Sequence, residues 1–419
     1  MLNRTTAPAF TRTTDFELIL PEELVLQNGA RIFFISGGTQ SVIRVEVLIK
    51  AGRWLERVWG ASYFSAQLLS KGTSSKKSFA IAQLFDQYGA HLEISPGLDV
   101  VSVSLYTLTK NLQPTLAMFR ELLQDSAFPE KELSQLKSIY LQNLRVNQEK
   151  TSFQASKLFR KKLFGENHPY GKELEAEEVQ TLTREQLIDH YTSFGKDFIV
   201  IVSGKIDSAS RQNIIDEFSS LSFIASPEKN ITAPNVNALH ERVSKEGSVQ
   251  SSIRMGKKAI ARSHPDYAAV LFLNHIFGGY FGSRLMKNIR EEKGLSYGIY
   301  SSIHTLQHDS YVVIGADVNN ENLDIAFEEI RKELKRLRTE PVDAEELEIA
   351  RNHFIGSLQA EITTPFAHAD KIKNMHMFRL PKNYYQNLIH NIDSVQADQL
   401  LDIASRYFQE GDFIEVSVG

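Results

Sequence analysis

Apolar and polar residues alternate along several short segments of the chain, and this alternation is typical of half-buried β-strands. Between Ile43 and Ile49 every second residue is apolar, whereas Arg44 and Glu46 fall on the opposite face. The spacing predicts a strand that buries one face against a core and turns a charged face away from it.

Turn residues join some of these strands into hairpins. Asn28-Gly29 stands between two apolar runs, and this dipeptide is the strongest short signal for a hairpin turn. Elsewhere the apolar residues recur with the period of an α-helix. The pattern predicts helices at 61–70, 77–88, 265–276 and 283–292, strands at 91–95 and 99–107, and a hairpin across 296–318.

The chain contains an internal repeat. The segments "DFIVIVSG" (197–204) and "DFIEVSVG" (412–419) lie 215 residues apart. Upstream of each copy, residues 109–144 and 320–358 share an Asn-Leu pair, an amphipathic helix, a Pro-containing turn and a second helix. Two blocks in the same order at nearly the same offset indicate a tandem of two similar domains of about 200 residues, a common domain size.

Strands grouped as hairpins, with runs of helices beside them, favour an antiparallel sheet with helices packed on one face. We therefore predict an α+β fold of two such domains in tandem. Residues 223–240 are rich in Pro and Asn and lack periodicity, which is typical of a linker. The predicted N-terminal domain is 1–222 and the predicted C-terminal domain is 241–419.

Composition narrows the function classes. A net charge of −4, with Lys and Arg scattered among Glu and Asp, argues against a nucleic-acid partner, because phosphate binding needs clustered cations. The absence of Cys excludes disulfides, thiolate metal sites and a Cys nucleophile. The polar start of the sequence lacks a secretory signal, and no window reaches the ~18 apolar residues of a membrane span. We therefore expect a cytoplasmic protein with no membrane partner.

One segment carries a chemical signature, "GASYFSAQLLSKGT" at residues 60–73. Together with the repeat, it resembles the pitrilysin (insulinase) family of zinc peptidases, which includes insulin-degrading enzyme and the processing peptidases. The resemblance covers the chain from about residue 20 to its end, and the length suits the smaller branch with two repeats per chain. Active members carry Gly-x-Ala-His-Phe-x-Glu-His-x-x-x-Lys-Gly-Thr, in which two His bind zinc and the Glu activates a water.

The zinc-binding residues of that motif are missing. Tyr63 and Gln67 stand at the two His positions, Ala66 stands at the Glu position, and the resemblance places the distal acidic ligand near Asn143. Amide oxygens are weak zinc ligands, a phenol must first lose a proton of pKa about 10, and a methyl group cannot accept a proton. The resemblance thus implies a chain without zinc of its own, and we expect residues 60–70 to form an ordinary amphipathic helix.

The second half retains family residues that complement this loss. The segment "FGSRLMKNIREEKGLSYG" matches the stretch in which an Arg and a Tyr reach the zinc site of active members, here Arg290 and Tyr297. The resemblance implies that this pair grips the substrate backbone and stabilises the oxyanion, for which a guanidinium and a phenol are suitable donors. Taken without the resemblance, the same residues would be a salt-bridged helix Arg and a strand Tyr.

A third segment departs from the family. Active members carry Gly-x-x-Asn-Ala on an edge strand that pairs with the substrate, and here Glu93 and Ile94 replace the Asn-Ala pair. An edge strand can still add a peptide, because main-chain hydrogen bonds do not depend on the side chains. The side-chain preference at this edge does not carry over.

Loss in the first half and retention in the second lead to a functional prediction. We expect the non-metal subunit of a zinc-dependent processing-type peptidase, which is inactive alone and binds no cofactor. It would supply substrate clamping and oxyanion stabilisation to a homologous zinc-bearing partner that acts on peptides. The alternative is a structural or peptide-binding homologue that acts as a scaffold or as a homodimer, in which Arg290 and Tyr297 would not affect turnover.

Overall fold

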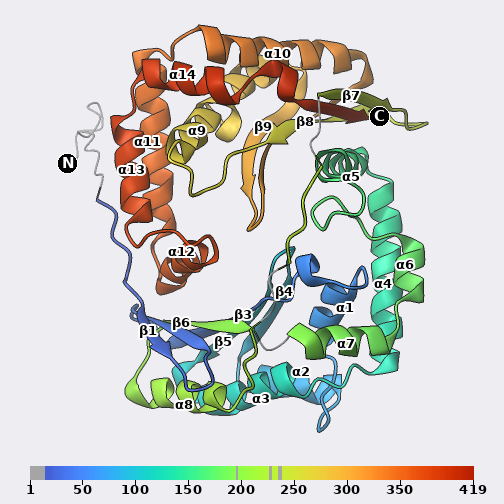
Figure 1. Ribbon diagram of the computed structural model, residues 1–419, viewed down its shortest axis with the longest axis vertical. Coiled ribbons are helices and arrows are strands. Elements are labelled where there is room, and N and C mark those ends of the chain that lie inside the picture. The colour runs from blue at the N-terminus through green and yellow to red at the C-terminus, as the bar shows by residue number, and fades with distance from the viewer. Residues whose placement is uncertain (1–14, 195–196, 226–228, 235–237) are drawn as a thin grey trace, which may run out of the picture.

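The computed structural model describes residues 15–194, 197–225, 229–234 and 238–419 and contains two halves of similar architecture (Figure 1). Each half is built on one sheet, with strand order β1-β2-β6-β3-β5-β4 in the first half and β7-β11-β8-β10-β9 in the second. The predicted α+β class and the two similar halves are confirmed. Residues 1–14 of the predicted N-terminal domain, and residues 226–228 and 235–237 of the predicted linker, lie outside the described residues.

The strands predicted at 43–49, 91–95 and 99–107 are present as β3, β4 and β5. The Asn28-Gly29 turn joins β1 and β2, and the hairpin of β9 and β10 matches the one predicted across 296–318. The strands are β1 (Glu22–Val25), β2 (Arg31–Ser36), β3 (Val42–Ile49), β4 (His91–Pro96), β5 (Val101–Leu108), β6 (Phe198–Gly204), β7 (Leu239–Val243), β8 (Gln250–Lys258), β9 (Ser296–Thr305), β10 (Ser310–Asn319) and β11 (Ile414–Val418).

Both sheets are mixed, although most of their strands pair antiparallel. β6 runs parallel to β2 in the first half, and β11 runs parallel to β7 in the second. Both β6 and β11 enter their sheets after a long excursion through helices, so no tight turn ties their direction to that of the neighbouring strand. The prediction of an antiparallel sheet therefore holds for all pairs but one in each half.

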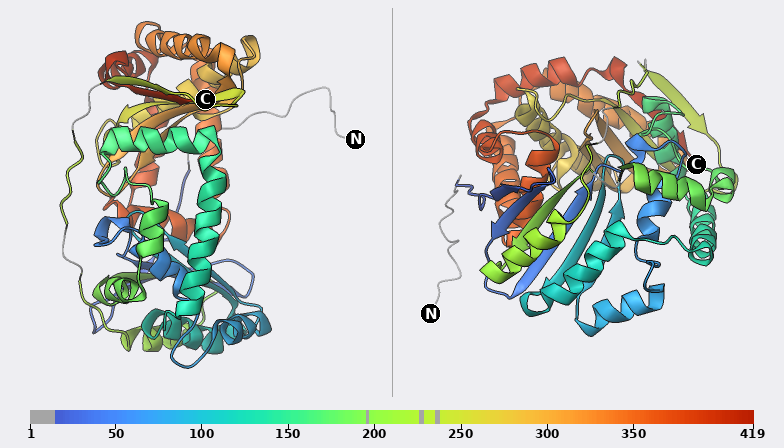
Figure 2. Two further views of the ribbon diagram at one scale, coloured as in Figure 1. Left: turned by 90° about the vertical axis from the view of Figure 1, so that its right-hand side faces the viewer. Right: turned by 60° about the horizontal axis from the view of Figure 1, so that its bottom comes forward.

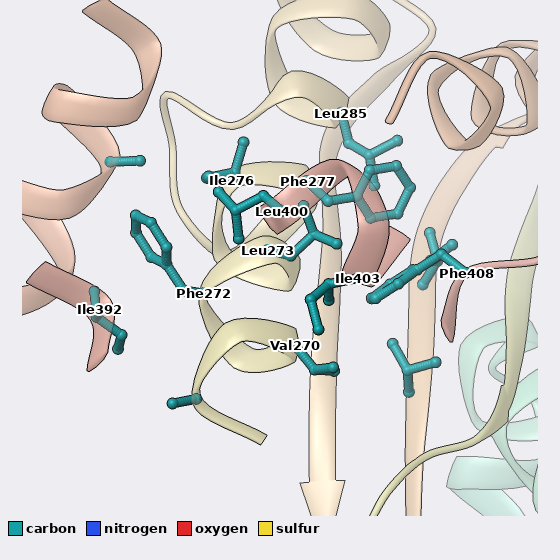
Figure 3. Packing of buried hydrophobic residues seen from close by; sticks show 14 of the residues in the cluster. Val270, Phe272, Leu273, Ile276, Phe277, Leu285, Ile392, Leu400, Ile403 and Phe408 are labelled. Carbon is teal, nitrogen blue, oxygen red and sulfur yellow. The ribbon is translucent and has the colours of Figure 1, made fainter. Parts of the chain in front are cut away.

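Helices cover the outer face of each sheet, and a hydrophobic core lies between the sheet and the helices in each half (Figures 1 and 2). Figure 3 shows the second core, where α9, α13 and α14 pack together. The helices are α1 (Ala61–Leu68), α2 (Ser78–Gln87), α3 (Leu112–Gln124), α4 (Glu130–Gln148), α5 (Thr151–Phe164), α6 (Ala176–Thr181), α7 (Arg184–Phe194), α8 (Ser208–Ser219), α9 (Tyr267–Asn274), α10 (Leu323–Thr339), α11 (Ala344–Glu361), α12 (Pro365–Met377), α13 (Tyr384–Ser394) and α14 (Ala397–Tyr407). Two π-helical segments, η3 (His275–Gly279) and η4 (Met286–Glu292), stand where α-helix was predicted.

The two halves exchange one helix each. α5 follows the long helix of the first half and packs on the inner face of the second-half sheet, against β8 and β11 (Figure 2). α12 holds the corresponding place in the second half and packs on β2 and β6 of the first-half sheet (Figure 1). Each inner face is therefore covered by the other half, and this reciprocal packing fixes how the halves sit against one another.

This exchange corrects the prediction for β3. Its charged face was expected to turn away from the core, yet Arg44 is 4% exposed and Glu46 is 2% exposed. Both residues face α12, where Arg44 lies 3.0 Å from Asp370 and Glu46 lies 2.9 Å from Lys373. The strand is buried on both faces because a helix from the other repeat covers its charged side.

A second contact between the halves lies at the tip of the β9–β10 hairpin. The ring of His308 stacks on Trp54 with the ring centroids 3.9 Å apart, and the backbone N–H of His308 donates to the Tyr170 hydroxyl. The backbone N–H of Gln307 donates to Asp99. The hairpin tip is thus held by a pocket of the first half. None of the described helices is long and apolar enough to cross a bilayer.

Candidate functional site

Helix α1 begins at a glycine and is capped by a buried acid. Gly60 has φ 91°, a left-handed conformation that glycine adopts at little cost. The Glu56 carboxylate accepts from the backbone N–H of Gly60 at 3.2 Å and of Ser62 at 2.8 Å. Burial raises the pKa of Glu56 to about 7, against the opposing effects of Arg53 and of these amides. Helix α1 therefore starts at a fixed place, as a site on a rigid element requires.

Two phenol rings and a phenyl ring fill the surroundings of the first predicted ligand position. The ring of Tyr63 lies 5.2 Å from those of Phe64 and Tyr140, and Phe64 lies 5.4 Å from Tyr140. Burial raises the pKa of Tyr63, and burial together with the charge of Glu173 raises that of Tyr140 to about 12. Both phenols therefore stay protonated at neutral pH, and neither becomes an anionic ligand.

The remaining predicted positions do not complete a metal site. Ala66 is buried in the core beside α7, Gln67 is half-buried, and Asn143 is exposed on α4. Tyr140 faces α1 from α4, and the sequence reasoning did not name it. Tyr140 lies three residues before Asn143, and this helical spacing next to the buried Leu144 could have indicated it.

The donor chemistry therefore does not fit zinc. The four positions offer a protonated phenol, a methyl group and two amides, the second of which is exposed. Zinc prefers thiolate, imidazole and carboxylate ligands. Among all the residues that the structure describes, no group of three or more His, Cys, Asp and Glu is placed to hold a metal ion. Within the predicted span 60–70, residues 61–68 form a helix, which buries Ala61, Phe64 and Leu68.

The structure brings Arg290 and Tyr297 together in the second half. The Arg290 guanidinium lies 4.6 Å from the Tyr297 ring centre and 5.0 Å from that of Phe281. Tyr297 is 89% exposed and Phe281 is 60% exposed. Within the described residues no carboxylate lies at ion-pair distance from Arg290, so its charge is held between two ring faces instead.

A neighbouring ion pair fixes the segment that carries this stack. The buried Arg284 donates to both carboxylate oxygens of Glu346 on α11, at 2.9 and 2.8 Å. Such a two-point contact orients the chain that leads into η4. Arg290 lies on η4 and Tyr297 on β9, an edge strand of its sheet. Phe281, which the sequence reasoning quoted only as part of the motif, completes the stack.

The predicted substrate strand is an edge strand. β4 is the last strand of the first-half sheet and pairs only with β5, with Glu93 opposite Ser104. Glu93 is exposed and Ile94 is half-buried, so the side chains alternate along the strand. α1 contacts β4, whereas Arg290 and Tyr297 belong to the other half. The predicted residues thus form two groups, one in each half.

Two family models match the chain. The family model described as insulinase (peptidase family M16) matches residues 31–176, and the one described as peptidase M16 inactive domain matches residues 181–354. The chain belongs to peptidase family M16. The model named inactive domain begins within the first half, because residues 181–354 include α7, β6 and α8, and it also covers Arg290 and Tyr297.

Relatives of this M16 chain carry contrasting names. A Bacillus subtilis protein named uncharacterized zinc protease YmxG is 23% identical over 394 residues, which cover 92% of this chain and 95% of that protein. A Helicobacter pylori protein named non-peptidase homolog YmxG is 22% identical over 371 residues, which cover 84% and 83%. The family therefore includes relatives named as proteases and a relative named as a non-peptidase.

Solved structures of the M16 family share the fold. A structure described as peptidase M16 inactive domain from Pseudomonas fluorescens has a TM-score of 0.88 at 22% identity, over 95% of this chain and 98% of that one. A protease from Helicobacter pylori has a TM-score of 0.87 at 20% identity, over 96% and 100%. At these identities the likeness establishes the two-half architecture of the M16 chain.

Proposed function

We propose that this M16 chain is the non-metal subunit of a zinc-dependent peptidase, inactive alone and active with a homologous zinc-bearing partner. Its own zinc positions hold Tyr63, Ala66 and Gln67, which cannot activate a water. Its second half presents the Arg290 guanidinium and the Tyr297 hydroxyl, which can donate hydrogen bonds to a peptide carbonyl and to an oxyanion. Catalysis would then be shared between two chains.

The exposed stack of Phe281, Arg290 and Tyr297 carries this proposal. Two exposed aromatic rings and a guanidinium that pairs with no carboxylate of the described chain form an unusual surface, because large apolar side chains and arginine are the residues that binding sites bury. A substrate carbonyl between the stack and the zinc of a partner would satisfy the free donors. The edge strand β4 offers main-chain hydrogen bonds for an extended peptide in the same complex.

Reconstitution tests the proposal. Three samples are prepared: this chain alone, a homologue from the same organism with an intact His-x-x-Glu-His helix alone, and the two chains expressed together. Peptide cleavage is then measured as kcat/KM for the three samples. We expect cleavage by the combined sample only. Full activity of the zinc-bearing homologue alone would contradict a catalytic contribution from this chain.

The second candidate is a scaffold or peptide-binding homologue, either in a complex or as a homodimer. The aromatic cluster of Tyr63 and Tyr140 favours it, because side chains that pack against one another at a predicted ligand position have a structural role. This candidate predicts binding of peptides or of a partner without a change in turnover. Variants at Arg290 distinguish the two functions, as described below.

A further inference from the structure

A large cavity lies between the two halves, apart from the predicted site positions. Its volume is about 1310 Å³, and its wall includes the ends of β2, β3 and β6, the last turn of α12 and the hairpin tip at 306–309. Residues 60–70, Glu93, Arg290 and Tyr297 are not part of this wall. Small-molecule sites measure about 300–1,000 Å³, so the cavity has room for a segment of polypeptide.

The acidic residues of the wall already have partners. Glu23 lies 3.7 Å from Arg31, and Asp197 lies 3.2 Å from Lys50. Asp99 accepts hydrogen bonds from the Tyr170 hydroxyl and from the backbone of Gln307, and Asp309 pairs with Lys258. Each of these carboxylates therefore has an ion-pair or hydrogen-bond partner within the protein.

Among the charged groups of the wall, Arg262 is held by aromatic rings. It follows β8, and its guanidinium lies 5.3 Å from the ring centres of Phe378 and Tyr384 and 5.9 Å from that of Tyr385. Its Nε donates to the Tyr384 hydroxyl and its Nη2 to the Tyr385 hydroxyl, each at 3.2 Å. Within the described residues no carboxylate pairs with this guanidinium and its Nη1 donates no hydrogen bond.

The phenols position Arg262 without neutralising it. Burial raises the pKa of Tyr384 and of Tyr385, so both remain uncharged at neutral pH. Three rings and two hydroxyl groups therefore hold one orientation of the guanidinium, and its positive charge persists at the wall. A carboxylate from outside the chain would supply the missing counter-charge, and its oxygens match the donors of a guanidinium.

The backbone at the same wall is strained. α12 ends in a left-handed turn in which the N–H of Leu380 donates to Met375 O and that of Arg379 donates to His376 O. Glycine is usual at the left-handed position of this motif, yet Arg379 occupies it with φ 52°. An arginine there costs about 1 kcal/mol relative to glycine, and it adds a cationic side chain to the wall. Lys382, three residues later, is an exposed lysine of the same wall.

We propose that this cavity binds the carboxylate of an acidic peptide, with Arg262 as the anchoring residue and Lys382 adding to the attraction. The inference rests on the proposed function in one respect, namely that the chain captures peptides. It adds the charge class of the peptide and the place where its carboxylate binds. The apolar part of the wall, which includes Phe33, Leu48 and Met375, would receive the rest of the peptide.

Fluorescence anisotropy with four labelled peptides tests the inference. The peptides share one sequence and carry either Glu or Gln side chains, each with a free or an amidated C-terminus. We expect the wild-type chain to bind a carboxylate-bearing peptide at least about tenfold more tightly than the Gln, amidated peptide, as one charge-assisted hydrogen bond allows. The four peptides show whether a side-chain or a terminal carboxylate provides this advantage.

Variants locate the effect. Arg262→Gln should reduce the affinity ratio between carboxylate-bearing and neutral peptides to about one, and Arg262→Lys should retain part of it. Lys382→Gln, at an exposed position, should lower the ratio without any effect on folding. Arg57→Gln is the matched control, because Arg57 is 73% exposed and outside the wall.

The outcomes separate this inference from the proposed function. Equal binding of all four peptides by the wild-type chain would overturn the carboxylate site and leave peptide capture intact. A ratio that Arg262→Gln and Lys382→Gln both leave unchanged would also overturn it. Failure of every peptide to bind would contradict peptide capture itself.

Discussion

Arg44 and Arg254 make equivalent contacts between the halves, each from the sheet of its own half to the helix that the other half contributes. Arg44 on β3 donates to the carbonyl of Phe366, the second residue of α12, and to the side chain of Asp370, the sixth. Arg254 on β8 donates to the carbonyl of Ser152 and the hydroxyl of Ser156, the second and sixth residues of α5. One buried arginine in each sheet thus anchors the helix that the other half contributes.

We predict that Arg44→Met destabilises the protein by about 3 kcal/mol, the usual range for breaking a buried ion pair, because Glu46 then keeps its buried charge with Lys373 alone. Arg254→Met should cost less, because its partners on α5 are uncharged. Urea denaturation measures both free energies of unfolding. Arg57→Met at the exposed surface is the control, with an expected change under about 0.5 kcal/mol. An unchanged free energy of unfolding in Arg44→Met would show that the packing of α12 on the first-half sheet does not depend on this contact.

The stack of His308 on Trp54 should hold the hairpin tip. In a Trp59→Phe background, which leaves Trp54 as the single tryptophan, His308→Ala should shift the fluorescence emission to longer wavelength because water then reaches the indole. The lost ring contact should cost about 1 kcal/mol. Gln307→Ala serves as the comparison, because it alters the same tip while retaining the backbone hydrogen bond to Asp99. An unchanged emission after His308→Ala would refute the packed tip.

Stability should fall in mild acid because of buried histidine. Burial lowers the pKa of His190 to about 3, below its ordinary 6.5. The unfolded chain therefore takes up a proton below pH 6.5 that the folded chain does not, so the free energy of unfolding is highest above pH 6.5. It decreases towards pH 3 by about 1.4 kcal/mol per pH unit for this residue. Urea denaturation between pH 6.5 and 4.5 should show that the free energy of unfolding depends less steeply on pH in His190→Gln, by that amount. Equal slopes would mean that His190 titrates normally.

Arg290 and Tyr297 should affect turnover by the reconstituted pair and not its assembly. Arg290→Ala and Tyr297→Phe should each lower kcat by about 10²-fold or more, the scale for loss of an oxyanion donor. Lys287→Ala is the matched control, because Lys287 is exposed on the same π-helical segment. Unchanged rates in both variants would favour the scaffold.

Local features of the fold could be predicted from the sequence, whereas its long-range packing could not. The Asn28-Gly29 hairpin, the alternation in β3 and the helix at α1 depend on residues close in sequence, so periodicity identified them. The exchange of α5 and α12 joins segments from about 100 to more than 300 residues apart, and no local pattern carries that information. For this reason the charged face of β3 was predicted as outward-facing and is buried.

The residues of the candidate site likewise include some that a local motif identifies and others that depend on long-range packing. Arg290 and Tyr297 could be named because a dense motif surrounds them, and the structure shows that their side chains are in contact. Tyr140 and Arg262 were missed, because each matters through its position against other elements. Tyr140 packs against α1, and Arg262 against α13 and the end of α12. The retained motif and the blank zinc positions nonetheless lead to one functional proposal.

Metal content measured together with peptidase activity tests the central claim most directly. The chain is purified alone and with its zinc-bearing homologue, and zinc is quantified per chain before and after addition of a chelator. The account predicts far less than one zinc per chain and no cleavage for the isolated protein, with chelator-sensitive cleavage by the pair. One zinc per isolated chain together with chelator-sensitive cleavage would contradict it.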